Sequence, residues 1–417
     1  MMEYHVISEA IRLLEEYRSG DAFFLSSPQQ TLLAQGTYAV LPPAEGDTEA
    51  GALSRRVAEL LQSAAKAGHD APVVVGALPF DPAQPAHLMV PMSVRTAGTL
   101  HMDISGPSGN RSAIKYKVRP YPEPKEYIRG VEQGISLLHK GELRKIVLSR
   151  TLLLTSPLPV DTAKLLSALA SSNPQGYTFA VNLPEPDSGK NGRQPAAQRR
   201  ERRTLIGASP ELLVKRKGLS VTANPLAGSA ARSSDPAEDR RRAEALLKSA
   251  KDLHEHQVVV EAVAAALRPY CKFLIVPPAP SLLQTATMWH LSTVLEGELS
   301  SPDVSSLELA GALHPTPAVC GTPTEAAREA IRKIEPFDRG FFTGMVGWCD
   351  LSGDGEWVVT IRCAEVEDCS LRLYAGAGVV SGSSPEGELA ETGAKFRTML
   401  RAMGIENEDS AEEGDAE

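Results

Sequence analysis

The segment from Lys145 to Thr155 constrains the fold more than any other part of the chain. Its sequence, Lys-Ile-Val-Leu-Ser-Arg-Thr-Leu-Leu-Leu-Thr, is almost continuously apolar apart from its first residue and its centre, which predicts one long strand. A lysine at the start of such a strand has two explanations. It can protect the edge of a sheet from pairing with another chain, or burial can disfavour its charged form and make it a base.

Hydrophobic periodicity and Gly or Pro punctuation predict helices and strands along the rest of the chain. The expected helices cover residues 3–19, 53–67, 125–140, 236–267, 305–313, 324–334 and 385–403. The expected strands cover residues 23–25, 73–75, 88–90, 344–349, 356–364 and 371–375, and a further strand starts at residue 204. With 33 Gly, 31 Pro and no collagen-like repeat, this mixture favours a loop-rich mixed fold over a helix bundle.

Pattern and charge divide the chain into three parts. Residues 1–119 form a weakly patterned N-terminal half without a recognisable motif, and residues 120–403 carry the candidate chemistry. Residues 404–417 hold seven acidic residues and no Lys or Arg, so they account for most of the net charge of −9. We expect this acidic tail to be disordered, and we expect residues 184–203, which are almost free of apolar side chains, to be an exposed insertion.

Several classes of protein are excluded by what the sequence lacks. Dense basic charge is confined to residues 199–203, which is typical of a solvated loop and argues against nucleic-acid binding. No apolar run approaches the roughly 18 residues that span a bilayer, and no secretory signal is visible. Five cysteines without a C-x-x-C pair are typical of reduced thiols. We therefore expect a cytoplasmic monomer that binds neither membranes nor nucleic acids.

The glycine-rich stretch at residues 375–384 is a candidate ligand-binding segment. Gly376, Gly378 and Gly382 have the spacing G-x-G-x-x-x-G, which is not the dinucleotide fingerprint, and the chain has neither a Walker A motif nor a G-x-S-x-G elbow. Small residues let a backbone approach a ligand closely and present N–H groups to an anion. The stretch therefore favours an anion over a nucleotide.

Glu255 is a candidate ligand for a hard cation. It lies between His254 and His256, whose i, i+2 spacing places them on different sides of a helix and does not fit a zinc site. A single helical carboxylate can contribute to an oxygen-liganded cation, with the other oxygens coming from elsewhere. The alternative explanation is an ordinary i, i+4 ion pair with Lys251.

Glu388, Glu391 and Lys395 form a second candidate group. Glu388 and Glu391 lie three residues apart on an expected helix, and Lys395 follows four residues after Glu391, so all three share one face. A solvated ladder of ion pairs explains this pattern equally well. The neighbouring glycine-rich stretch makes us favour a binding role.

Glu211 is the candidate proton donor. In Gly207-Ala-Ser-Pro-Glu-Leu-Leu-Val it lies where a turn enters another strand, and burial there would raise its pKa. Lys145 and Glu211 thus supply a base and an acid from separate strands, as an elimination or substitution on a small molecule requires.

The motifs of residues 120–403 together resemble those of the chorismate-utilising enzymes and, within that family, the isochorismate synthases. They are KIVLSR, GASPEL, PLAGSA, KDLHEH, TMWHLST, LHPTPAVCG, IEPFDRGFFTGMVGWCD, GEWVVTIRCA, LYAGAGVV and SSPEGELAETGAK. The resemblance implies an α+β fold in which two related halves join their antiparallel sheets into one core, with helices outside and a deep cleft. It also implies the dicarboxylate chorismate as substrate and one Mg²⁺ as cofactor.

The same resemblance implies roles for individual residues. Lys145 corresponds to the base that activates water for attack at ring C2, and Glu211 to the acid that protonates the departing C4 hydroxyl. The implied metal ligands are Glu255, Glu388 and Glu391. The implied contacts to the carboxylates and hydroxyls of the substrate are Gly228, Ser229, His290, Arg362, Gly376 and Lys395. Without the resemblance, His290 would be an ordinary packed histidine, as would His314.

Alternatives within the family differ in product and pathway. Lys145 is typical of members that use water, and Ala227 argues against aminodeoxychorismate synthase. The Trp-Val-Val-Thr-Ile-Arg-Cys run favours the branch that leads to 2,3-dihydroxybenzoate and catecholate siderophores over the menaquinone branch. A salicylate synthase, which would also release pyruvate, stays open, and Val319 lies on the loop that could distinguish it. A non-catalytic chorismate-binding protein is the alternative from another class, and retention of the acid, base and metal-ligand residues argues against it.

Overall fold

The structure, a computed structural model, describes residues 8–43, 51–102, 115–183 and 203–405. The insertion expected at residues 184–203 and the acidic tail expected at 404–417 lie outside these ranges except for residue 203 and residues 404–405. The same holds for the first residues of the helix expected at 3–19. No helix within the described ranges is long and apolar enough to cross a membrane.

Two large antiparallel sheets and one small sheet form the centre of the molecule. The ten-stranded sheet contains β1 (Ala22–Ser26), β2 (Thr31–Gln35), β6 (Ser93–Ala97), β7 (Lys117–Tyr121), β8 (Lys145–Thr155), β9 (Tyr177–Leu183), β10 (Arg203–Ser209), β18 (Gly321–Thr322), β21 (Cys363–Glu367) and β22 (Ser370–Val379). The nine-stranded sheet contains β3 (Ala39–Val40), β4 (Val73–Leu78), β5 (His87–Val90), β11 (Leu212–Lys217), β12 (Ser220–Asn224), β14 (Cys271–Ile275), β17 (Leu295–Leu299), β19 (Met345–Asp350) and β20 (Gly355–Val359). The small sheet contains β13 (Leu226–Ala231), β15 (Ser281–Gln284) and β16 (Met288–Ser292).

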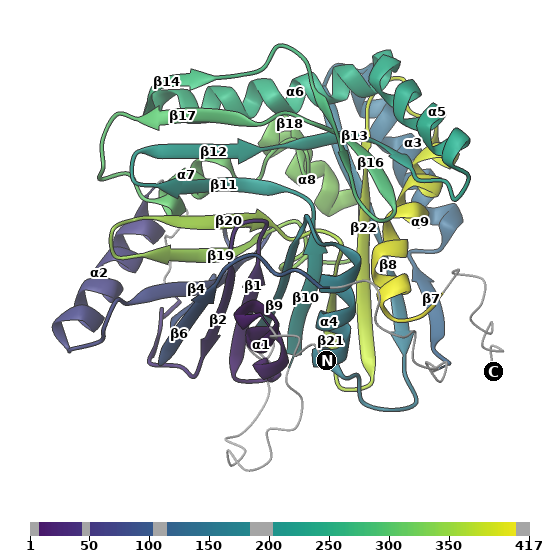
Figure 1. Ribbon diagram of the computed structural model, residues 1–417. Helices are drawn as coiled ribbons and strands as arrows, with labels where there is room; N and C mark the ends of the chain where they lie inside the picture. Colours follow the sequence, from purple (N-terminus) through teal and green to yellow (C-terminus); the bar gives the residue numbers. More distant parts are fainter. Residues whose placement is uncertain (1–7, 44–50, 103–114, 184–202, 406–417) are drawn as a thin grey trace, which may run out of the picture.

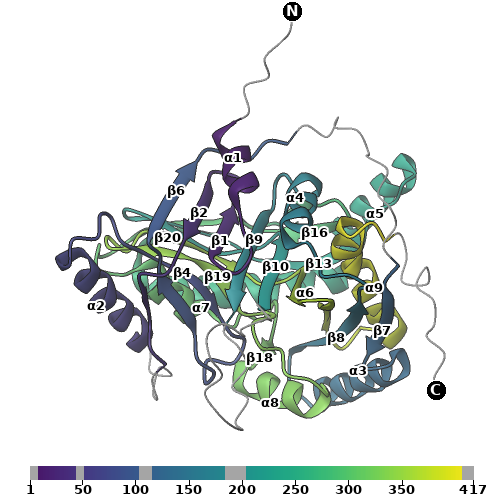
Figure 2. The ribbon, with the colours of Figure 1, turned by 90° about the horizontal axis from the view of Figure 1, so that it is seen from below.

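Helices cover the outer faces of the two large sheets. They are α1 (Glu9–Glu16), α2 (Ala52–Lys66), α3 (Pro124–His139), α4 (Thr162–Ser172), α5 (Pro236–Lys248), α6 (Ala250–Leu267), α7 (Ser306–Leu313), α8 (Thr324–Ile334) and α9 (Pro385–Ala402), and a short 3₁₀ turn, η2 (Arg268–Tyr270), follows α6. Apolar side chains of α1, α4 and α9 pack on the ten-stranded sheet, and those of α2, α6 and α7 on the nine-stranded sheet. Helices α3 and α8 lie side by side against β8 (Figure 2).

The two large sheets share one apolar core. Side chains from both sheets, such as Phe179 of β9 and Val346 of β19, belong to a single buried cluster between them. Figure 1 shows the strands of the two sheets running in crossing directions. Strands from residues 1–119 contribute to both sheets, so this segment completes the common core. The fold is therefore the mixed helix and antiparallel-sheet architecture with outer helices that the family resemblance implied.

Strand β8 has the bounds predicted from its composition, and it is an interior strand. It pairs with β22 along almost its whole length, with β7 at its C-terminal half and with β18 at its N-terminal end. The neighbouring residues from Ile146 to Leu154 are buried with the single partial exception of Leu153. The edge-protection explanation for the lysine at its start is therefore wrong.

The single helix expected at residues 236–267 is also wrong. The structure has two helices, α5 and α6, separated by Ser249, whose backbone is extended with ψ of 111°. The Ser249 side chain accepts a hydrogen bond from the backbone N–H of Asp252 and caps α6. The capping tendency of serine outweighs the continuous helical periodicity here, and the break gives α6 its own direction.

The single strand expected at residues 356–364 belongs to two sheets. β20 ends at Val359 in the nine-stranded sheet, and β21 starts at Cys363 in the ten-stranded sheet. Between them, Arg362 has φ of 52°, a left-handed backbone conformation that residues other than glycine rarely adopt. The chain therefore crosses from one sheet to the other at Arg362. The hairpin of β19 and β20, expected from the turn at residues 352–355, is confirmed.

A buried ion pair ties the end of α8 to β8. The Glu335 carboxylate lies 2.6 Å from the Arg339 guanidinium, and both side chains are 2% exposed. Glu335 also accepts a hydrogen bond from the backbone N–H of Ser149, at 2.7 Å. Arg339 donates to the backbone oxygens of Val147 and Val319, each at 2.8 Å. This pair therefore joins β8 to the loop before β18.

We predict that Arg339→Ala lowers the free energy of unfolding by about 3–5 kcal/mol, because it leaves the Glu335 carboxylate buried without a counterion. Urea unfolding at pH 7 measures the loss. The matched control is Arg332→Ala on α8, which removes a more exposed ion pair with Asp81 and should cost under about 1 kcal/mol. Equal losses in the two variants would contradict the structural role of the buried pair.

Candidate active site

A small cavity of about 50 Å³ lies where the small sheet, α6, α9 and β22 meet. Nine of the eleven residues proposed from the sequence line it. They are Glu211, Gly228, Ser229, Glu255, His290, Arg362, Gly376, Glu391 and Lys395. Of the other two, Lys145 forms an ion pair with Glu255 of this lining, and Glu388 lies three residues before the lining residue Glu391 on α9. Segments far apart in the sequence thus converge on one site.

Lys145 is fully buried at the start of β8. Its relative exposure is 0%, and its Nζ lies 3.0 Å from Oε1 of Glu255 on α6. The ammonium has no hydrogen-bond partner besides this ion pair among the described residues. Glu255 thus pairs across the fold with Lys145, and the alternative pairing with Lys251 four residues earlier is wrong.

Gly378 makes room for this ion pair. A Cβ atom at this position would lie 2.0 Å from Glu255 Oε1 and 3.0 Å from Cε of Lys145, far inside normal contact distances. Gly376 and Gly378 are residues of β22 and pair with Ser149 and Val147 of β8. At Gly378 the backbone approaches the Glu255 side chain closely, and both glycines line the cavity. That this segment presents N–H groups to an anion stays a prediction.

Glu211 directly precedes β11 and is 3% exposed. Burial raises its pKa from 4.5 to about 7, although the backbone N–H of Leu226 and the charges of Lys145 and Arg362 act in the opposite direction. Its Oε1 lies 3.4 Å from the Leu226 nitrogen. Near neutral pH a large fraction of this carboxyl group is therefore protonated and able to donate a proton, as expected from the sequence.

Arg362 and His290 face each other across the cavity. The guanidinium lies 3.5 Å from Nε2 of His290 on β16, and no carboxylate of the described residues forms an ion pair with it. Burial lowers the pKa of Arg362 to about 10. Burial and the nearby Arg362 charge lower the pKa of His290 well below its usual value, so this imidazole is neutral. Arg362 is thus a buried cation open to an anionic ligand.

Glu388 and Glu391 each form an ion pair with a lysine. Glu388 lies 2.8 Å from Nζ of Lys251, and Glu391 lies 2.6 Å from Nζ of Lys395. Glu391 also accepts a hydrogen bond from Ser229 Oγ at 2.9 Å. The solvated-ladder explanation is wrong, since Glu388 is 1% exposed.

The pKa values of the two glutamates of α9 are shifted in opposite directions. Burial and the charge of Glu391 raise the pKa of Glu388. Burial would also raise the pKa of Glu391, but Lys395, Lys251 and the Ser229 hydroxyl outweigh it, so this pKa is lowered. The two carboxylates therefore repel each other and share the positive charge of two lysines.

The chemistry of the three glutamates fits a hard cation. Glu255, Glu388 and Glu391 present only oxygen atoms, the donors that Mg²⁺ prefers. Oε2 of Glu388 is buried and has no hydrogen-bond partner in the part of the chain that the structure describes, which leaves one oxygen available to a cation. Within the described ranges no three His, Cys, Asp or Glu side chains already converge as a ligand cluster, because each glutamate is drawn to a lysine.

Three contributors to the site were not recognised from the sequence as such. Lys251 was considered only as a partner of Glu255, yet it pairs with Glu388 from another helix. Phe342 and Thr343 line the cavity within a motif that was quoted only for the resemblance. His314, by contrast, bonds to the Pro79 oxygen outside the cavity, so it is the ordinary packed histidine that was expected.

This fold and this cavity define a class of protein: the chain belongs to the chorismate-binding enzymes, whose family model, "Chorismate binding enzyme", matches residues 97–404. The names of individual relatives are more specific than that of the family model. "Isochorismate synthase DhbC" of Bacillus subtilis (strain 168) is 58% identical over 409 residues, which cover 98% of this chain and 100% of that protein. "Vibriobactin-specific isochorismate synthase" of Vibrio cholerae is 43% identical over 410 residues, 97% of each chain. The crystal structure of DhbC from Bacillus anthracis, at 54% identity, matches with a TM-score of 0.88 over 95% of this chain and 100% of that one.

We predict that Glu211→Gln stabilises the protein at alkaline pH. The raised pKa of about 7 means that the native state of the wild type loses stability as the pH rises from the unfolded value near 4.5 through 7, whereas glutamine does not titrate. The gain of the variant over the wild type should grow by about 2–3 kcal/mol between pH 5 and pH 8. Urea unfolding at the two pH values measures it.

The control for this prediction is Glu329→Gln, which removes a carboxylate exposed on α8. Its effect on the free energy of unfolding should change little over the same pH interval. A gain for Glu211→Gln that stays constant from pH 5 to pH 8 would mean that the carboxyl group is not buried as described.

Proposed function

We infer that the protein is an isomerase that converts chorismate to isochorismate. The observation that carries this inference is a buried lysine, ion-paired with the cavity-lining Glu255, close to a buried glutamate at the same cavity whose pKa is raised to about 7. The chain also aligns end to end with isochorismate synthase DhbC of Bacillus subtilis. Removing a hydroxyl group from one ring carbon and adding one at another requires an acid and a base at the same cavity.

The chemistry of the two residues is a substitution with a shift of both ring double bonds. Lys145 acts as the base in its neutral amine form, after its ammonium group has released a proton to solvent: it takes a proton from water, and the water oxygen forms a bond to C2 of the ring. The two ring double bonds move, the C4–O bond breaks, and Glu211 gives its proton to the departing hydroxyl, which leaves as water. One proton is taken up by the lysine and one is given by the glutamate, so protons balance over the step. The raised pKa of Glu211 supports its role as the acid.

The cation-rich wall of the cavity suits a substrate with two carboxylates. Arg362 is buried without an acidic partner, and a guanidinium grips a carboxylate by two parallel hydrogen bonds. The neutral His290 adds a hydrogen-bonding nitrogen beside it. Lys395 donates to the backbone oxygen of Gly376 and lies at the same cavity. Gly228 and Ser229 also line the cavity, and Ser229 pairs with His290 across the small sheet, where their polar atoms can contact ring hydroxyls.

We also propose Mg²⁺ as the cofactor, held by Glu255, Glu388 and Glu391. The all-oxygen donor set and the unpartnered oxygen of Glu388 support this proposal. When bound, Mg²⁺ would supply positive charge for the ring carboxylate of chorismate. Lys145 stays the residue that moves the proton in the attack on C2, and Glu211 stays the proton donor at C4.

The product feeds the branch that leads to 2,3-dihydroxybenzoate and a catecholate siderophore. DhbC from Bacillus anthracis, designated a 2,3-dihydroxybenzoate-specific isochorismate synthase, shares 54% of residues with this chain. We propose the cytoplasm as its location, which its five free cysteines favour. That the enzyme acts as a monomer stays our prediction.

We predict that the purified protein turns chorismate into isochorismate and forms neither salicylate nor anthranilate. Chromatographic separation of the three products after incubation with Mg²⁺ measures this.

Lys145→Ala and Glu211→Gln should each lower turnover by about 10² to 10⁴, the usual contribution of a positioned acid or base. Salicylate and pyruvate as main products would favour the salicylate synthase alternative, and near-wild-type turnover of either variant would remove that residue from its role.

We predict that EDTA abolishes turnover and that added Mg²⁺ restores it, while Glu391→Gln is not restored at any Mg²⁺ concentration. Because removal of a carboxylate weakens a site for a hard cation, the variant should also lose Mg²⁺ binding in isothermal titration calorimetry, which reports on the site without turnover. Glu329→Gln on the exposed face of α8 serves as control. Full turnover after exhaustive chelation would contradict the metal proposal.

A further inference from the structure

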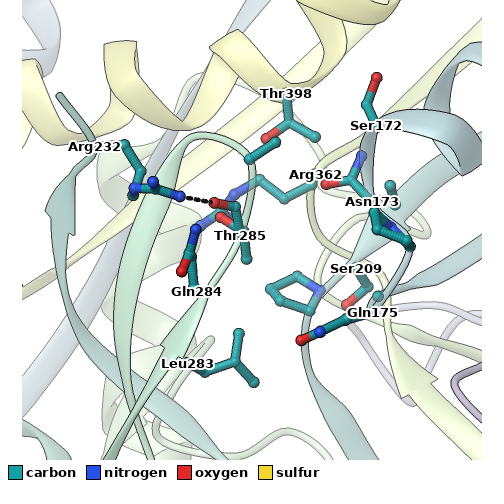
Figure 3. A pocket seen from close by; sticks show the side chains of 15 residues that line it. Ser172, Asn173, Gln175, Ser209, Arg232, Leu283, Gln284, Thr285, Arg362 and Thr398 are labelled. Carbon is teal, nitrogen blue, oxygen red and sulfur yellow. Dashed lines mark hydrogen bonds between the residues drawn. The ribbon is translucent and has the colours of Figure 1, made fainter. Parts of the chain in front are cut away.

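A second and larger cavity, of about 290 Å³, lies on the outer side of Arg362. Figure 3 shows it between two walls, the hairpin of β15 and β16 with Leu283, Gln284 and Thr285, and the loop after α4 with Ser172, Asn173 and Gln175. The inner end is formed by Pro210 and Arg362, which also line the catalytic cavity. The two cavities are therefore neighbours that share these two residues.

The lining of the outer cavity carries no negative charge. It consists of Ser172, Asn173, Pro174, Gln175, Gly176, Ala208, Ser209, Pro210, Arg232, Leu283, Gln284, Thr285, Ala286, Arg362 and Thr398. The catalytic cavity, by contrast, includes Glu211, Glu255 and Glu391 in its lining. An anionic molecule in the outer cavity therefore meets neutral hydrogen-bonding groups and arginine, and no carboxylate of the lining repels it.

The two arginines of the outer cavity differ in how they are paired. Arg232 forms an ion pair with Asp239 at 2.8 Å and stacks on Trp289, so its charge is largely balanced. Arg362 has no such partner among the described residues. The arginine without a direct ion pair thus lies at the junction with the catalytic cavity, where the charges of Glu391 and Glu211 act on it from beyond ion-pair distance.

The hairpin wall is held in place by bonds to two other elements. Arg232 donates to the Thr285 oxygen at 2.9 Å (Figure 3), and the hydroxyl groups of Thr287 and Thr398 lie 3.0 Å apart. Arg401 of α9 donates to the Ala286 oxygen at 3.2 Å. The same hairpin carries His290 into the catalytic cavity. The outer cavity is therefore a formed part of the structure, fixed relative to the reacting groups.

We propose that this outer cavity is the passage through which the dicarboxylate substrate reaches the catalytic cavity and the product leaves it. The inference rests on the proposed function. A dianion is first received among the neutral polar side chains of the two walls. It then moves toward Arg362, because this guanidinium at the junction has no direct ion pair among the described residues and attracts its carboxylate. Gln175 and Ala286 are exposed at the rim of the passage and contact none of the reacting groups.

The first test changes charge at the rim without touching the catalytic residues. Gln175→Glu should lower kcat/KM for chorismate about threefold, and Gln175→Lys should raise it by a similar factor, from the Coulomb energy of a dianion about 10 Å from one charge in water. Both effects should vanish at about 0.5 M salt because the charges are screened, while kcat stays unchanged. The matched controls are Gln133→Glu and Gln133→Lys on α3, in a groove beside α8, which should leave kcat/KM unchanged.

The second test narrows the passage with a bulky side chain. Ala286→Trp should lower kcat/KM by about tenfold or more. The walls of the passage must then move apart before the substrate can enter, and a required conformational change slows association. Ala326→Trp, exposed in the groove between α3 and α8, is the control of equal size. Unfolding midpoints close to that of the wild type verify that both variants are folded.

The outcomes separate the passage from the proposed function. Opposite, salt-sensitive shifts of kcat/KM in the two Gln175 variants, together with a loss in Ala286→Trp alone, support the passage. Unchanged kcat/KM in all three variants, with normal turnover by the wild type, would overturn the passage and leave the proposed function intact. Failure of the wild type itself to form isochorismate would overturn the proposed function and the passage with it.

Discussion

The buried ion pair between Lys145 and Glu255 is the interaction on which the rest of the site depends. An ammonium group inside a sheet without a counterion would cost several kcal/mol, so an interior strand that starts with lysine requires a carboxylate from another element. Glu255 of α6 supplies it at 3.0 Å, and only a residue without a Cβ fits between strand and carboxylate, which is the position of Gly378. One pair of charges thus aligns three segments that are more than a hundred residues apart.

A second buried pair stabilises the same strand from behind. Glu335 and Arg339 bind the backbone of Ser149 and Val147 and reach Val319, and Val147 and Val319 line the cavity. The two pairs differ in what surrounds them. Arg339 is saturated by backbone oxygens and its partner carboxylate, which makes the pair a rigid support. Lys145, by contrast, has no hydrogen-bond partner besides its ion pair among the described residues. Of these two buried cations, Lys145 is the one suited to chemistry, because fewer of its hydrogen-bonding positions are occupied.

The balance of charges at the cavity explains which ligand it suits. Glu255, Glu388 and Glu391 each have a lysine partner, and burial keeps Glu211 largely protonated near neutral pH. Arg362 remains as a buried cation without an acidic partner. It occupies the point where the chain crosses between the two large sheets and where the inner and outer cavities meet. A carboxylate-bearing substrate supplies the charge that the protein lacks at this point.

The sequence by itself determined the elements whose signals are local. Continuous branched residues predicted β8 with its bounds, caps and periodicity predicted most helices within a few residues, and a turn followed by a strand predicted the buried Glu211. The family resemblance of the motifs also indicated nine of the residues that line the cavity, among them its charged side chains. Only the tertiary structure decided which strands lie side by side and which charged side chains form ion pairs. Whether Lys145 lies at an edge or in the interior depends on β18 and β22, and whether Glu255 pairs with Lys251 or Lys145 depends on how α6 packs, since ion pairing selects the nearest charge in space. The crossing at Arg362 and the strand conformation of Gly376 and Gly378 likewise follow from hydrogen bonds between distant strands, which no local pattern encodes.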